Sequence, residues 1–177
     1  MRVMAIAIVT AGILGLGAAA ARAGEGEHPA PPASTQLEQL KSLAGRWEGT
    51  AQEGTAAEQP AVSEYKVTSG GSAVIETIFA GTPHEMVSVY HDGRNGKPAL
   101  THYCMIGNQP EMELTSSGDK KFDFVLASSS PIPASEMHMH QVALTWDAPD
   151  QITQVWSSYK DGQPTGESMT LRLKRVN

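Results

Sequence analysis

Histidine and cysteine side chains, which suit proton transfer and metal binding, gather in two stretches of this chain. The first stretch runs from position 84 to 110 and holds three of the six histidines and the only cysteine, Cys104. The second stretch carries His138 and His140, two residues apart. Imidazole and thiolate groups are ligands for zinc and copper, and both can also hydrogen-bond a small molecule. These stretches therefore mark the candidate site.

The segments that must position these residues have the composition of short strands. After position 45, strand-forming segments alternate with turn residues, including Gly-Gly, Asp-Gly and Asn-Gly pairs. The segments are 46–53, 62–68, 72–79, 85–91, 99–106, 111–115, 122–127, 138–146, 152–159 and 168–174. Strands at such regular spacing pair with their sequence neighbours, and closure removes exposed edges. We predict an all-β fold, a single antiparallel up-and-down β-barrel of about ten strands, with a two-sheet sandwich as the alternative.

One short helix is predicted before the first strand. Thr35 and Glu38 have the spacing of a capping box, in which a hydroxyl and a carboxylate satisfy backbone N–H groups. Leu37, Leu40 and Leu43 then recur at one-turn spacing, and a glycine follows as a stop. The apolar stripe predicts that this helix packs against the barrel or plugs it.

The N-terminal segment has the features of a secretory signal. Arg2 precedes an uncharged apolar run, and an Ala-x-Ala cleavage pattern ends at Ala23. We therefore assign residues 1–23 to a signal peptide, 24–34 to a flexible Pro-, Ala- and Gly-rich leader, and 35–177 to the barrel domain. The expected location is the periplasm or the medium, with no membrane span after cleavage.

Composition narrows the choice of partners. The chain of 177 residues has a formal net charge of −6 at pH 7, and removal of the signal, with its two arginines, makes the charge more negative. This balance argues against nucleic acid or an anionic membrane as a partner. One cysteine cannot form an internal disulfide, so Cys104 is either inert or functional.

A Gly-x-Trp motif at positions 45–47, after a helix and before a run of strands, resembles the calycin group: lipocalins, fatty-acid-binding proteins and nitrobindin-like barrels. The stretches THYCMIGNQP and MHMH are similar to uncharacterised bacterial proteins with this barrel. The resemblance implies that Trp47 closes the barrel base under a basic side chain of the last strand, Arg172 or Arg175. In nitrobindin-like barrels a histidine near the chain end holds haem, whereas no histidine follows His140 here.

Strand alternation predicts which polar side chains share a face. His102 and Cys104 alternate with outward positions of one strand, and His138 and His140 do so in another. Asn108 follows the strand that carries His102 and Cys104. Its side-chain amide can either cap its own turn or project over the barrel mouth. The predicted ligand-binding set is Glu76, His102, Cys104, Asn108, His138 and His140.

Three interpretations of this set remain open. The polar residues can be packed side chains with satisfied hydrogen bonds, which serve structure alone. They can fix the polar end of a small apolar or amphipathic molecule in a cavity. They can instead bind zinc or copper, through His102, Cys104, His138 and His140.

Catalysis is not expected from the sequence. The chain has neither a Gly-x-Ser-x-Gly elbow nor a His-Glu-x-x-His motif. A cysteine nucleophile needs a helix N-terminus or a paired imidazolium, and Cys104 is predicted to lie in a strand. We therefore predict an exported small-molecule-binding barrel, with a metal-binding protein or metal-dependent enzyme as the alternative.

Overall fold

The computed structural model describes residues 32–176, so the predicted signal peptide and most of the leader lie outside the described residues. This part of the chain forms one short helix, one 3-10 turn and ten strands. The helical elements are α1 (Thr35–Lys41) and η1 (Ser69–Gly71). The strands are β1 (Gly45–Glu53), β2 (Gln59–Thr68), β3 (Ala73–Ile78), β4 (Met86–Asp92), β5 (Pro98–Tyr103), β6 (Glu111–Gly118), β7 (Lys121–Leu126), β8 (His138–Ala148), β9 (Gln151–Lys160) and β10 (Gln163–Val176).

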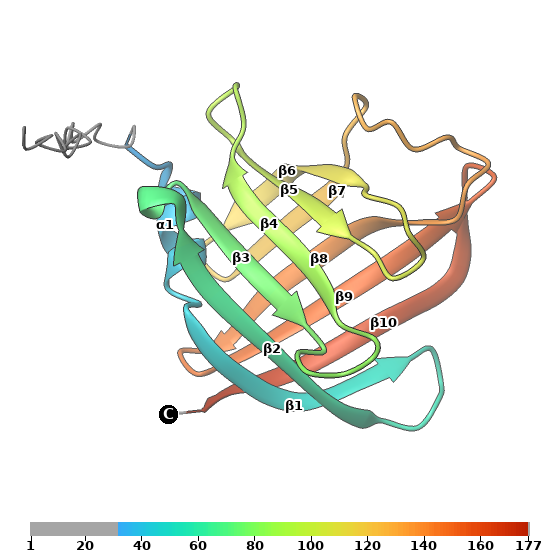
Figure 1. Ribbon diagram of the computed structural model, residues 1–177, viewed down its shortest axis with the longest axis horizontal. Coiled ribbons are helices and arrows are strands. Elements are labelled where there is room, and N and C mark those ends of the chain that lie inside the picture. Colours follow the sequence, from blue (N-terminus) through green and yellow to red (C-terminus); the bar gives the residue numbers. More distant parts are fainter. Residues whose placement is uncertain (1–31, 177) are drawn as a thin grey trace, which may run out of the picture.

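The strands form a closed antiparallel barrel in which each pairs with its neighbours in sequence (Figure 1). β1 closes the ring by pairing with both β2 and β10. This arrangement confirms the predicted up-and-down barrel and excludes the sandwich. No helix among residues 32–176 is long and apolar enough to cross a membrane.

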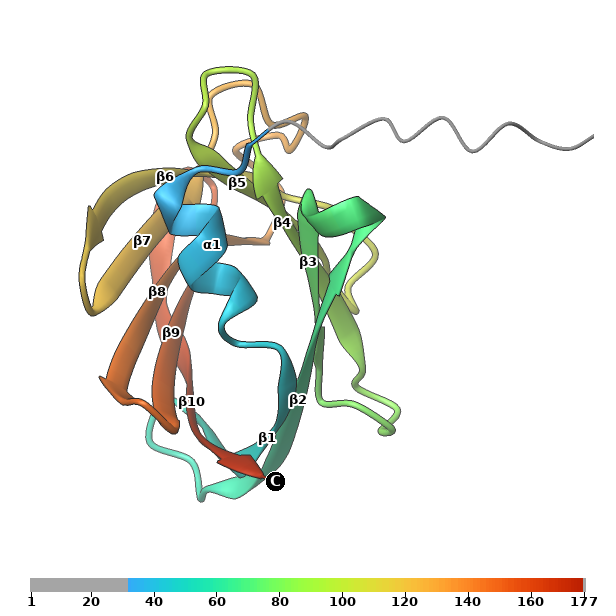
Figure 2. The ribbon, with the colours of Figure 1, turned by 90° about the vertical axis from the view of Figure 1, so that its left-hand side faces the viewer.

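The helix α1 lies across one end of the barrel (Figure 2). Its leucines at positions 37, 40 and 43 are buried, as the apolar stripe predicts. The predicted capping box is wrong by one residue, because Ser34 is the N-cap and its Oγ accepts a hydrogen bond from the Leu37 N–H at 3.0 Å. The Ser34 hydroxyl also donates to Asp92 at 2.6 Å, which ties the helix start to the end of β4. Glu38 instead pairs with Lys41.

Trp47 closes the same end beneath the helix. Its indole is fully buried and its Nε1–H donates to the Leu43 carbonyl oxygen at 2.8 Å. The Arg175 guanidinium stacks over the ring at 4.3 Å and donates to the carbonyls of Ser42 and Ala44. A basic side chain over the tryptophan is thus confirmed, and it comes from Arg175 rather than Arg172.

The two ends of the barrel differ in construction. We call the end covered by α1 the capped end, and the opposite end the loop end. At the loop end the strands are joined by residues 54–58, 79–85, 104–110, 127–137 and 161–162. β5 stops at Tyr103, three residues earlier than predicted, because the chain turns there and Gly107 takes a positive φ of 92°. The candidate site residues lie between these two ends or beyond the last strand residues at the loop end.

Candidate ligand-binding site

A row of polar side chains crosses the inner wall of the barrel at mid-height. Tyr65 on β2 pairs with Glu76 on β3, Glu76 pairs with Ser88 on β4, and Ser88 pairs with His102 on β5. All four side chains are buried. Because directly opposite residues of antiparallel strands point to the same face, the register alone aligns these four groups. We call them the polar row.

Glu76 is the centre of this row. Its carboxylate accepts hydrogen bonds from the Tyr90 hydroxyl at 2.9 Å and from the Gln154 amide at 2.6 Å. Burial raises the pKa of Glu76, and the hydrogen bonds from Gln154, Tyr65 and Tyr90 oppose that rise. Burial, together with the nearby Glu76 carboxylate, raises the pKa of both tyrosines well above 10. None of the ion pairs in the described part of the chain includes Glu76. Phenol and amide donors therefore stabilise this carboxyl group.

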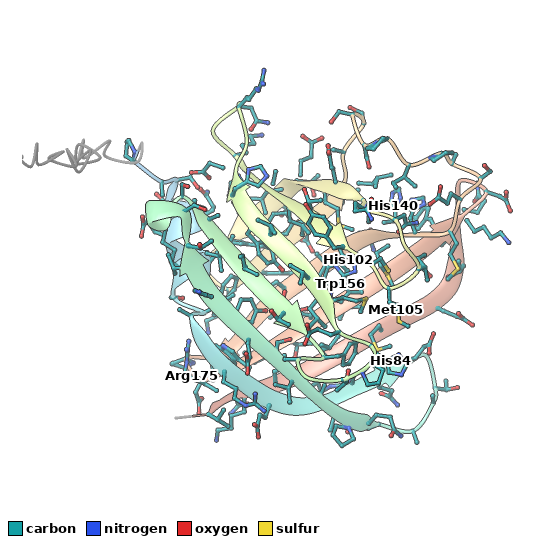
Figure 3. All side chains as sticks on the ribbon, viewed as in Figure 1. His84, His102, Met105, His140, Trp156 and Arg175 are labelled. Atoms are coloured by element: carbon teal, nitrogen blue, oxygen red, sulfur yellow. The ribbon has the colours of Figure 1, made fainter. Side chains whose placement is uncertain are left out.

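Gln154 and Trp156 on β9 contact the row from across the lumen. The Gln154 amide nitrogen donates to both Tyr65 and Glu76, and its oxygen accepts from the Trp156 Nε1–H at 2.8 Å. The Trp156 ring packs against the His102 ring with centroids 4.7 Å apart, and Figure 3 shows the two side by side. These contacts link β9 to β2, β3 and β5 across the barrel interior.

His102 is held in a buried, neutral state. Its Nδ1 shares a 3.0 Å hydrogen bond with the Ser88 hydroxyl, and burial lowers its pKa from 6.5 to about 4. Its other ring nitrogen, Nε2, makes no hydrogen bond to any residue in the range 32–176. Ser63 stands two residues before Tyr65 on β2, nearer the loop end, and lies close enough to Glu76 to lower the pKa of that carboxyl group. Its buried Oγ has no hydrogen-bond partner among residues 32–176. Of the polar atoms on this inner wall, the Ser63 Oγ is thus the one that is both buried and without a partner in the described chain.

Sulfur-containing side chains lie between the polar row and the loop end. The Cys104 Sγ lies 4.0 Å from the Met86 Sδ. Met139 and Met169 are partly buried against the same core. Each points inward, because Met139 pairs with buried Ser158 and Met169 pairs with buried Trp156. The partly buried inner methionines, which we call the methionine rim, are Met86, Met139 and Met169.

Exposed apolar side chains gather around the rim. Large apolar residues with more than a third of their surface exposed are Tyr103 at the end of β5, Met105 and Ile106 in the next loop, and Met137 before β8. Figure 3 shows Met105 near the loop end, far from Arg175 at the capped end. Val176 is the one such residue at the capped end of the described chain. This uneven distribution distinguishes the loop end from the rest of the surface.

His138 and His140 do not join the polar row. His138 pairs with Tyr159, which lies on the opposite face from buried Ser158, so its ring lies on the outer wall. The register shifts between Met139 and Gln141, and this bulge also turns His140 outward. His140 stacks on Tyr159 with centroids 3.7 Å apart. The predicted inward orientation of this pair is therefore corrected: simple alternation fails at the bulge.

Asn108 connects two loops rather than facing the lumen. Its side-chain amide donates to the Glu136 carboxylate and to the Met137 carbonyl oxygen, each at 2.8 Å. Its own oxygen is buried without a partner among the described residues. Asn108 thus fixes the 127–137 loop against the 104–110 loop, directly above His138.

The predicted metal set is divided between these places. His102 lies in the lumen and Cys104 at its rim, whereas His138 and His140 form a pair on the outer wall. Across the described residues, no three of His, Cys, Asp and Glu come together in a group able to hold a metal ion. Any metal centre here would have to use fewer than three of these side chains.

Sequence reasoning missed several groups that complete the interior. They are Ser63, Tyr65, Ser88, Tyr90, Gln154 and Trp156. Strand alternation could have placed Ser63, Ser88 and Gln154 on an inner face, since each stands two residues from a buried apolar neighbour. What joins them into one network is the register between strands, which a single sequence does not give.

Two surface hollows lie away from this network, beside the β4–β5 turn. They measure about 370 and 490 Å³, and Gly93 and Arg94 line both. Neither contains a predicted site residue. Their walls come from the turn and from parts of α1, β4, β5 and β6, and they include no residue of the polar row or the methionine rim.

Comparison with known proteins supports the fold. No protein-family model and no curated protein sequence matches the chain. The chain is similar to a protein of unknown function from the DUF3598 family of Nostoc punctiforme, with a TM-score of 0.53 and 14% identity. That match covers 78% of this chain and 49% of the other, so the chain spans about half the length of that structure. At this identity the likeness shows the fold alone.

Two further structures share the barrel shape less closely. A redesigned β-barrel matches 78% of this chain and 95% of its own length, with a TM-score of 0.39 and 15% identity. EF1p2_mFAP2b bound to DFHBI matches 79% of this chain and 97% of its own length, with the same TM-score and identity. Neither carries an inference about function.

Proposed function

We propose that this protein is an exported calycin-type barrel that binds a small amphipathic molecule at its loop end and catalyses no reaction. The observation that carries the proposal is the gathering of apolar side chains there. The methionine rim is half-buried, and exposed Met105, Ile106 and Met137 lie in loops at the same end of the barrel. Methionine is flexible and polarizable, so such a surface adapts to apolar ligands of different shape.

The polar row supplies a floor for the ligand's polar end. Ser63 Oγ is buried in the lumen without a hydrogen-bond partner in the described chain, and His102 bonds Ser88 only through its Nδ1, so its Nε2 faces no donor or acceptor of residues 32–176. A hydroxyl, amide or carboxyl group of a ligand that reached them would satisfy both, and unsatisfied buried polar groups are otherwise costly. The Gln154–Glu76 bridge blocks deeper entry. The ligand is therefore expected to occupy the space between the rim and the row.

Removal of apolar surface from water contributes to the free energy of ligand binding at the loop end. Apolar surface removed from water contributes about 25 cal/mol per Å², and a ligand covering three methionines and an isoleucine would bury a substantial apolar area. The polar row contains no lysine or arginine, and its one acidic group, Glu76, already accepts hydrogen bonds from Tyr90 and Gln154. Shape and hydrogen bonding are expected to set its specificity.

Native mass spectrometry with elemental analysis tests the proposal. Untagged protein purified from an exporting host is expected to carry an organic molecule, or to bind anilinonaphthalene sulfonate in competition with decanoate. Replacement of His102 by Gln is expected to weaken the binding of decanoate more than that of the fluorescent probe, because decanoate places its carboxyl group at the polar row. Absence of both co-purified ligand and competitive probe binding would overturn the proposal.

Export is part of the proposal and has its own test. N-terminal sequencing of the protein from its native host is expected to begin at Gly24, after the Ala-x-Ala pattern. A soluble product that retains Met1 would contradict export without affecting the binding proposal.

A further inference from the structure

The outer wall of the barrel brings two imidazole nitrogens together. His138 Nε2 and His140 Nδ1 are 3.1 Å apart, and their ring centroids are 5.3 Å apart. The pair belongs to β8, on the face opposite the lumen, so it is independent of the ligand site proposed above. None of the contacts that stabilise the polar row involves either residue.

The protonation state of His138 follows from its other hydrogen bond. Its Nδ1 lies 2.7 Å from the backbone carbonyl oxygen of Glu136. A carbonyl oxygen can only accept, so Nδ1 carries the proton and donates it. In the neutral ring the Nε2 lone pair then points toward His140. Metal-binding histidines are commonly fixed by such a hydrogen bond to a backbone carbonyl, which sets the tautomer and the ring orientation.

The second imidazole is also fixed in orientation. The bulge at His140 aims its Nδ1 at His138, and Tyr159 stacks against its ring at an interplanar angle of 15°. His140 is only partly buried, whereas His138 is 2% exposed. The open side of the pair therefore lies at His140, where water molecules can complete a coordination sphere. Asn108 holds Glu136 from the neighbouring loop, so the carbonyl that orients His138 is itself positioned.

We propose that His138 Nε2 and His140 Nδ1 chelate a divalent transition-metal ion, Cu²⁺ or Zn²⁺, with water in the remaining positions. Metal–nitrogen bonds of about 2.0–2.1 Å to two atoms 3.1 Å apart enclose an angle of about 100°. That angle lies between the tetragonal geometry of Cu²⁺ and the tetrahedral geometry of Zn²⁺. On binding, the proton on His140 Nδ1 moves to its Nε2, so both rings remain neutral and no net proton is released.

The expected order of metal affinities follows from the two nitrogen ligands. Nitrogen ligands bind Cu²⁺ more tightly than Zn²⁺, and both more tightly than Mn²⁺. With two protein ligands, the remaining positions stay open to exogenous ligands. The site is therefore expected to bind one ion per chain and to accept a small added ligand such as imidazole.

Copper titration followed by electron paramagnetic resonance tests the site directly. The full mature chain is used with His28→Gln, because His28 near the mature N-terminus could bind copper by itself. The spectrum of the first equivalent of Cu²⁺ is expected to show coupling to two ring nitrogens, and Zn²⁺ is expected to compete for the same site. The matched controls His84→Gln and His91→Gln, which remove histidines outside the pair, are expected to leave the spectrum unchanged.

The decisive variants are His140→Phe and His140→Gln. Phenylalanine keeps the ring stacked on Tyr159 but removes the ligating nitrogen, and glutamine serves if phenylalanine impairs folding, which circular dichroism checks. Either substitution is expected to lower the affinity for the first equivalent of Cu²⁺ at least about 10-fold, because even the loss of a group that only orients a metal ligand typically costs that much. The coupling to one nitrogen is expected to disappear from the spectrum. Unchanged affinity and spectrum in the folded variants, or no stoichiometric binding by the parent chain, would overturn the proposal.

Discussion

The capped end and the loop end of the barrel differ in how completely their apolar side chains are buried and their polar atoms are hydrogen-bonded. At the capped end, Trp47 has its indole N–H bonded and its ring covered by Arg175. From the polar row toward the loop end, Met86 and its rim partners are only half-buried, and the buried Ser63 Oγ has no hydrogen-bond partner among the described residues. A packed and fully satisfied end stabilises a fold, whereas an end with exposed apolar and unpaired polar groups suits binding. Under the proposed function, stability and binding are separated along the barrel axis.

The largest expected effect is on the stability of the capped end. Trp47→Ala removes a fully buried indole and its stacking contact with the Arg175 guanidinium, so the free energy of unfolding is expected to fall by about 3–5 kcal/mol. Urea unfolding followed by circular dichroism measures this loss. The affinity for anilinonaphthalene sulfonate in the folded fraction is expected to stay the same. A matching fall in affinity would show that the two ends are coupled.

His102, in the polar row between the ends, is expected to make the free energy of unfolding depend on pH, by about 3 kcal/mol. Burial lowers the pKa of His102 to about 4, so between pH 6.5 and 4 the unfolded chain binds more protons at this position than the folded chain. The free energy of unfolding therefore decreases as pH falls through this window. Glu76, with a raised pKa, acts in the opposite direction, since its contribution falls as pH rises above 4.5.

A comparison with His102→Gln isolates the histidine from the carboxyl group. Glutamine does not titrate, so the stability difference between the two proteins is expected to shift by about 3 kcal/mol from pH 7 to pH 4, with the parent losing more. Stability curves that remain parallel over this range would show that His102 titrates normally and is not enclosed as described.

A smaller effect is expected at the start of the helix. Ser34→Ala removes the N-cap and the hydrogen bond to Asp92, at a cost of about 1–2 kcal/mol. Thr35→Ala tests the cap that the sequence pattern predicted, and it is expected to change the free energy of unfolding by less than about 0.5 kcal/mol. Thermal melts of the two variants compare them. An equal loss of stability in both variants would support the capping box that the sequence predicted at Thr35.

The smallest stability effect is paired with a binding effect. Ile106, at the loop end, is 54% exposed, and Val176, at the capped end, is 38% exposed. Replacing either with Gln is expected to change stability by less than about 0.5 kcal/mol. Only Ile106→Gln is expected to weaken fluorescence-detected probe binding. Equal loss of binding in both variants would mean that the probe reports general surface apolarity.

The sequence predicted the fold well because local patterns encode it. Period-two alternation and turn pairs located all ten strands, and Gly-x-Trp predicted the stacked pair that Arg175 completes. It predicted less of the site for two physical reasons. The partners of Glu76 depend on register across strands, and the facing of His138 and His140 depends on one extra residue in a bulge. Neither leaves a mark in a single sequence.

The central claim, that small molecules bind at the loop end, is most directly tested by methionine-methyl NMR. Protein labelled with ¹³C at its methionine methyl groups is titrated with decanoate. The resonances of Met86, Met139 and Met169 are expected to shift together and saturate. The resonance of Met112 is expected not to shift, because Met112 is 1% exposed and pairs with Leu100 on the capped-end side of the polar row. Shifts confined to Met112, or saturable binding that leaves the methionine rim unshifted, would contradict the account.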